Sequence, residues 1–102
     1  MRYRVRLSAS AIEDLARLTE HLVVHAAESA RDPERRLRDA IEVLERLPFV
    51  GRPARTVEGL NLTLRELVVP SGDTGYVLLY RVGPGRLVSI LAARHQREEQ
   101  YH

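Results

Sequence analysis

The chain of 102 residues suits one domain over residues 1–102 and is too short to divide comfortably into two. With 44% hydrophobic and only 5% aromatic residues, its core is expected to be aliphatic. Arginine supplies all 16 basic residues and 14 Asp and Glu nearly balance them, so the net charge of +2 indicates a polyanionic partner only weakly. The absence of cysteine excludes a disulfide framework, a thiolate metal site and a cysteine nucleophile.

No apolar run approaches the roughly 18 residues that a membrane span requires, and an alternating pattern begins at once at the amino terminus. We therefore expect a cytoplasmic protein without a signal peptide, a membrane partner or a cofactor. In residues 2–7 arginines alternate with apolar side chains, which predicts a strand with one buried and one basic face.

A first helix is predicted from Ser10, which forms a capping box with Glu13. Apolar residues recur at helical spacing to about residue 28 and predict one buried stripe. This stripe consists of Ile12, Leu15, Ala16, Leu22, Val23 and Ala26.

A second helix is predicted from Asp32 as cap and Pro33 in the first helical position, and Pro48 ends it. Its apolar stripe is Leu37, Ala40, Ile41, Leu44 and Leu47. The short polar segment between the two helices predicts an antiparallel helical hairpin.

Residues 49–53 are predicted as a turn-rich connector, and residues 60–69 as a strand with a bulge near Arg65 and Glu66. Residues 76–82 are apolar on both faces, which predicts an interior strand, and residues 87–93 form the last strand. The predicted fold is α+β, in the order β-α-α-β-β-β, with the helical hairpin on one face of a small, mainly antiparallel sheet of four strands.

His21 and His25 have the i,i+4 spacing of a helical metal pair, but no third ligand accompanies them and no Glu stands between them as in H-E-x-x-H. We therefore predict no metal site. The tail, residues 94–102, gathers Arg, His and Tyr where the last strand leaves the sheet. Guanidinium could hold phosphate and imidazole or phenol could move a proton, whereas a frayed polar terminus is the equal alternative.

Four segments together resemble the ParE/RelE superfamily of bacterial toxins: residues 3–8, 47–53, 76–82 and 90–97. The resemblance implies the toxin half of a type II toxin–antitoxin module, with growth arrest, plasmid stabilization and neutralisation by a cognate antitoxin. RelE-like members cleave mRNA on the ribosome, whereas ParE-like members inhibit DNA gyrase. A toxin homodimer stays open, as does a degenerate, non-toxic family member that only binds a partner.

When the functional positions of the ribonucleases are compared with this sequence, Arg65 matches a basic strand residue. Tyr101 matches a tail tyrosine that some of them have. His95 stands where one group has arginine, although other members use a histidine in this tail. Val77 replaces a further arginine and Thr63 another basic residue, and the loss of such a donor opposite the scissile phosphate typically costs a few kcal/mol of barrier.

The resemblance therefore favours the ParE-like branch, with DNA gyrase as target and no catalytic residue. If the protein is instead a ribosome-dependent mRNA endoribonuclease, the catalytic residues would be Arg65, His95 and Tyr101. The residues expected to bind the target or the antitoxin are Arg65, Arg81, Arg94, His95, Arg97 and Tyr101.

Overall fold

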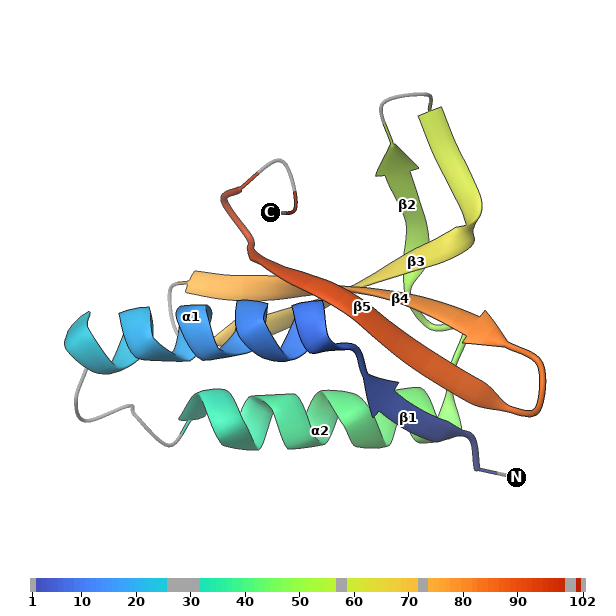
Figure 1. The fold of residues 1–102 in the computed structure, drawn as a ribbon, viewed down its shortest axis with the longest axis horizontal. Helices are drawn as coiled ribbons and strands as arrows, with labels where there is room; N and C mark the ends of the chain where they lie inside the picture. Colours follow the sequence, from blue (N-terminus) through green and yellow to red (C-terminus); the bar gives the residue numbers. More distant parts are fainter. Residues whose placement is uncertain (1, 26–31, 57–58, 72–73, 99–100, 102) are drawn as a thin grey trace.

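The computed structural model describes residues 2–25, 32–56, 59–71, 74–98 and 101, and within them two helices and five strands follow one another (Figure 1). The elements are β1 (Arg4–Leu7), α1 (Ala9–His25), α2 (Asp32–Arg46), β2 (Arg52–Thr56), β3 (Gly59–Ser71), β4 (Thr74–Gly83) and β5 (Leu87–His95). None of the helices in this part of the chain is long and apolar enough to cross a membrane.

The strands form a sheet in the order β1-β5-β4-β3-β2, in which only the β1–β5 pair is parallel. Figure 1 shows α1 and α2 side by side and running in opposite directions, as the helical hairpin was predicted to do. Alternate side chains of β3, β4 and β5 pack with both helices in one core cluster, which includes Val69, Leu78, Tyr80 and Ile90. The predicted α+β class with both helices on one face is therefore confirmed.

The fifth strand is a correction, because the predicted connector includes the start of β2. Among residues 52–55 of this strand, whose side chains the structure describes, only Ala54 is deeply buried. The sequence therefore lacks the alternation that indicates a strand. Pro53 is tolerated because β2 lies at the edge of the sheet. Between Pro53 and Ala54 the partner on β3 changes from Arg65 to Asn61, so the irregularity lies just before the bulge predicted at Arg65 and Glu66.

The start and the orientation of α1 also differ from the prediction. Ser8 caps the helix: its Oγ accepts the Ala11 N–H at 3.0 Å, so the predicted capping box at Ser10 was wrong. The buried face of α1 includes Asp14, whose carboxylate accepts the Ala93 N–H at 3.0 Å. This bond gives an acceptor to a β5 N–H that lies beyond the end of the pairing between β5 and β1. Because Asp14 faces the sheet, Ile12 faces away from it and is 55% exposed.

The helical stripes are otherwise partly confirmed. Leu15 is buried on α1, whereas Ala16 is exposed. On α2, Ala40 and Leu44 are buried with Leu37 and Ile41 packed against them, whereas Leu47 lies beyond the helix end and is 60% exposed. The side chains of Leu22, Val23 and Ala26 lie outside the described residues.

Candidate functional site

Residues 96–98 and 101, which follow β5, lie over the face of the sheet that the helices leave open. Gln96 N–H donates to the Gly75 carbonyl at 2.8 Å, and the Tyr101 hydroxyl reaches Glu66 on β3. Val77 is fully buried although its side chain belongs to this open face. In Figure 1 the segment stands above β5, on the side away from α2.

Arg94 anchors this segment from β5. Its Nη1 donates to the carbonyls of His95 at 3.3 Å and Gln96 at 3.4 Å, and also to that of Glu98. Its Nη2 donates to Glu66 Oε2 at 3.3 Å, and its guanidinium lies 5.3 Å from the centre of the Tyr101 ring. The guanidinium is therefore held by the chain's own tail rather than displayed to solvent.

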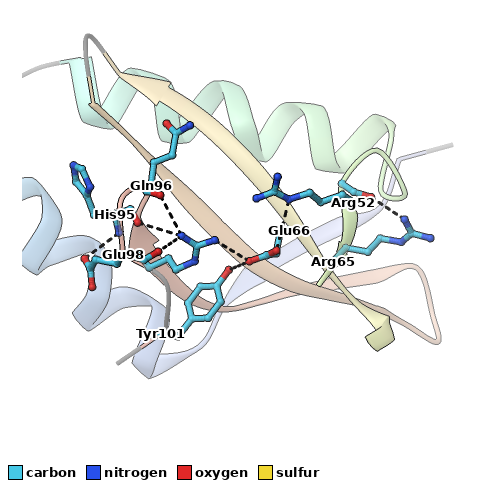
Figure 2. Close-up of polar contacts among 9 residues, drawn as sticks. Arg52, Arg65, Glu66, His95, Gln96, Glu98 and Tyr101 are labelled. Atoms are coloured by element: carbon cyan, nitrogen blue, oxygen red, sulfur yellow. Dashed lines mark hydrogen bonds and ion pairs between the residues drawn. The ribbon is translucent and has the colours of Figure 1, made fainter. Parts of the chain in front are cut away.

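Glu66 is the centre of this polar cluster, as the dashed contacts in Figure 2 show. Its Oε2 accepts the Tyr101 hydroxyl at 2.6 Å as well as Arg94 Nη2, and its Oε1 lies 3.6 Å from Arg52 Nε. The side chain is almost completely buried, so its charge depends on these three donors. We call Arg52, Glu66, Arg94 and Tyr101 the Glu66 cluster.

The Tyr101 phenol is a hydrogen-bond donor in this cluster and not a proton acceptor. Burial raises its pKa well above the usual value, and the hydrogen bond and negative charge of Glu66 raise it further, whereas Arg94 lowers it. The phenol therefore keeps its proton at neutral pH. This state suits a structural latch and does not suit a general base.

Arg65 has a different partner set, because neighbouring strand residues point to opposite faces of a sheet. Its Nη1 donates to the Gly51 carbonyl at 2.8 Å and the Phe49 carbonyl at 3.4 Å, and its guanidinium lies 5.4 Å from the centre of the Phe49 ring. Figure 2 shows Arg65 on the other side of Glu66 from Tyr101. Arg65 thus fastens the connector before β2 to β3.

The same connector is fixed by a buried tyrosine. Gly51 N–H donates to the hydroxyl of Tyr80 at 2.8 Å. Burial raises the pKa of Tyr80, against the opposing effects of that bond and of the Arg65 charge. A Cβ on Gly51 would lie 2.6 Å from the Tyr80 hydroxyl and 2.7 Å from the Glu66 carbonyl, so only glycine fits there.

The other predicted site residues divide between two places. His95 Nδ1 accepts the Arg97 N–H at 3.1 Å, and the His95 N–H donates to Glu98 Oε1, which also lies 3.5 Å from Arg17 on α1. Arg81 lines a shallow hollow at the far end of β4. The hollow is lined by Phe49, Thr63, Arg65, Arg81, Val82, Gly83 and Pro84.

The structure therefore brings Arg94 and Tyr101 together, and Arg65 with Arg81, but it does not join Arg65, His95 and Tyr101 into one site. Sequence reasoning missed Glu66, which it treated only as part of a bulge. The signal was a single carboxylate beside Arg65 in the strand run of residues 64–69, whose other members are apolar.

No group of His, Asp or Glu that could hold a metal ion occurs among the residues that the structure describes. His21 and His25 lie on α1, but their side chains are outside the described set.

Comparisons with known proteins agree on one group of relatives. The family model described as the ParE toxin of the type II toxin–antitoxin system parDE matches residues 5–100. A chain of the chromosomal ParDE system from P. aeruginosa superposes with a TM-score of 0.68 at 18% identity, over 90% of this chain and 94% of that one. A chain of the toxin–antitoxin complex RelBE2 from Mycobacterium tuberculosis has a TM-score of 0.55 at 28% identity, over 94% and 100%. Comparison with curated protein sequences gives no significant match.

Proposed function

The chain belongs to the ParE family of toxins from type II toxin–antitoxin systems, and from this premise we propose that it inhibits DNA gyrase by binding and is neutralised by a cognate antitoxin. The proposal makes the protein a binding toxin and not a nuclease. It rests mainly on one observation, which is the commitment of Tyr101 and Arg94 to Glu66.

Cleavage of RNA requires a group that takes a proton from the attacking hydroxyl and positive charge beside the scissile phosphate. The Tyr101 hydroxyl already donates a hydrogen bond to Glu66, and its raised pKa opposes its use as a base. Arg94 is buried and is bound to three carbonyls of its own tail and to the same carboxylate. Both side chains are thus engaged in contacts within the protein.

The other positions of a ribonuclease site do not supply the missing proton acceptor or positive charge. Val77 is fully buried and carries no charge where the ribonucleases have an arginine. Arg65 faces the connector and lies away from Tyr101 (Figure 2). A binding function needs no such convergence, which favours the gyrase proposal.

An exposed apolar surface beside the end of α2 supports the binding of a protein partner. Leu47, Phe49 and Val50 are each at least half exposed, and Phe49 also lines the hollow with Arg65 and Arg81. Aromatic and arginine side chains are enriched at the centres of protein interfaces. We call Phe49, Arg65 and Arg81 the Phe49 surface and assign it to contact with the target or the antitoxin.

Neutralisation by an antitoxin is proposed from the relatives, because both similar chains come from toxin–antitoxin systems. The exposed Phe49 ring and the guanidinium groups of the Phe49 surface suit an acidic, partly apolar segment. Co-expression with the product of an adjacent small gene should then yield a complex that contains both chains.

Controlled expression in bacteria separates the alternatives. The proposal predicts growth arrest together with loss of negative supercoiling in a reporter plasmid, while ribosome-bound transcripts stay intact. Primer extension on those transcripts is the second measurement. Codon-periodic cleavage with normal supercoiling would establish the ribonuclease alternative, and a harmless product would indicate a degenerate family member.

A further inference from the structure

Arg94 and Tyr101 as hydrogen-bond donors and Arg52 as an ion-pair partner converge on Glu66 at the open sheet face. Each of the three residues also has contacts that do not involve the Glu66 carboxylate. Arg94 is fixed by the tail carbonyls and Tyr101 by its ring contact with Arg94. The backbone of Arg52 is fixed by strand pairing, since β2 places it directly opposite Glu66 on β3. The donors therefore form a site whose backbone and ring positions do not require the Glu66 carboxylate.

Glu66 fills this site incompletely. Its bond to the Tyr101 hydroxyl is short at 2.6 Å, but Arg94 Nη2 lies at 3.3 Å and Arg52 Nε at 3.6 Å. Charge-assisted N–H···O bonds normally measure about 2.7–2.9 Å. Both guanidinium contacts are thus longer than their optimum.

The edge of the Arg94 guanidinium that contacts Glu66 also has an unused donor. Its buried Nε has no hydrogen-bond partner among the described residues. Nε and Nη2 lie on one edge of the planar group, and two parallel N–H donors on such an edge match two oxygens of one anion. Glu66 uses only Nη2, so an anion that replaced it could use both donors of this edge.

The charge balance points in the same direction, because two guanidinium groups face one carboxylate. Burying a charge is costly unless it is paired, so removal of Glu66 would leave Arg94 as an uncompensated buried cation. We propose that Glu66 is an internal anion that occupies a phosphate-binding site formed by Arg52, Arg94 and Tyr101, and thereby determines that this sheet face does not bind nucleic-acid phosphates. This role is independent of the proposed action on gyrase, which we assign to the Phe49 surface and not to the Glu66 cluster.

Thermal unfolding of Glu66→Ala tests the proposal directly. Inorganic phosphate should raise the melting temperature of this variant by about 6–11 °C once its concentration exceeds the dissociation constant tenfold. Chloride at the same ionic strength should give no such rise. The wild-type protein should respond to phosphate no more than it does to chloride.

Two variants control the measurement. Glu66→Gln keeps the site filled with an uncharged side chain of nearly the same shape, so we expect no phosphate-specific rise. Arg52→Ala in the Glu66→Ala background removes an exposed donor with little effect on the core, so we expect the rise to shrink by at least half. The proposal is overturned if folded Glu66→Ala responds to phosphate like the wild type, or if Glu66→Ala stays unfolded even in phosphate.

Fluorescence anisotropy with a labelled single-stranded RNA of ten uridines distinguishes a nucleic-acid phosphate from free phosphate. Glu66→Ala should bind this RNA at least tenfold more tightly than the wild type, and added salt should weaken the binding. A phosphate response without any gain in RNA binding would contradict the second half of the proposal. Since neither assay contains gyrase, both outcomes are separable from the outcome of the gyrase test.

Discussion

The Tyr101 hydroxyl donates to Glu66 Oε2 at 2.6 Å, which bonds a residue beyond the last strand to β3, 35 positions earlier in the chain. Since the acceptor is a buried carboxylate, Tyr101→Phe should lower the free energy of unfolding by about 1–3 kcal/mol. Urea denaturation measures this change. In a Glu66→Gln background the same substitution should cost clearly less, and an equal cost in both backgrounds would show that the bond contributes nothing.

The close contact of Gly51 with β3 and β4 gives a second prediction. A Cβ at this position would lie 2.6 Å from the Tyr80 hydroxyl, so Gly51→Ala should destabilise the protein by about 1–3 kcal/mol. Gly83→Ala is the matched control, because a Cβ there would meet its nearest atom at an ordinary 3.7 Å. Denaturation curves that shift equally for the two variants would refute the steric argument.

The bond between Asp14 and the Ala93 N–H predicts a difference between two replacements of one side chain. Asp14→Ala leaves this buried N–H without an acceptor, which should cost about 1–3 kcal/mol of unfolding free energy. Asp14→Asn keeps an acceptor oxygen and should cost less. Hydrogen exchange at the Ala93 amide is the local measurement, and Asp39→Ala on the exposed face of α2 is the control.

The buried tyrosines predict loss of stability in alkali. Burial raises the pKa of Tyr76 from 10.0 to about 12, although Arg36 opposes the rise. Between these values the unfolded state has lost the proton that the folded state keeps, so stability is full below pH 10 and falls as the pH approaches 12. Tyr76 alone should lower the free energy of unfolding by about 1 kcal/mol at pH 11.

The measurement is the free energy of unfolding at pH 9 and pH 11. In Tyr76→Phe the difference between the two pH values should be smaller than in the wild type. Tyr80 and Tyr101 also have raised pKa values and act in the same direction, so a residual loss is expected. An unchanged pH dependence in Tyr76→Phe would contradict the assignment.

Much of the fold was predictable because its signals are local. Burial is predicted from the local pattern alone in three places: the alternation in residues 2–7, the apolar stripe of α2, and β4, which is apolar on both faces. The missed strand β2 carries no such signal, since its residues include Pro53 and its pairing is decided by β3. The Ile12 error has a similar origin, because a tertiary bond from Asp14 and not the apolar pattern decides which side of α1 faces the sheet.

The site was less predictable than the fold. The tail residues Arg94 and Tyr101 were identified from their chemistry, but their partner Glu66 lies on a distant strand and gave only a weak local signal. Arg65 was assigned to the same site, although its side chain emerges on the opposite face from that of Glu66. Which face a strand residue uses depends on register, and the irregular pairing of β2 with β3 obscured the register.

The central claim is that the protein acts on gyrase by binding and without a catalytic tyrosine. Its most direct test is the supercoiling of relaxed plasmid by purified DNA gyrase in the presence of the wild-type toxin, of Tyr101→Phe, and of Arg81→Glu on the Phe49 surface. The account predicts that the wild type and Tyr101→Phe inhibit supercoiling at similar concentrations, whereas Arg81→Glu inhibits at least tenfold more weakly. Undiminished supercoiling with the wild-type toxin, alongside ribosome-dependent RNA cleavage that Tyr101→Phe abolishes, would contradict it.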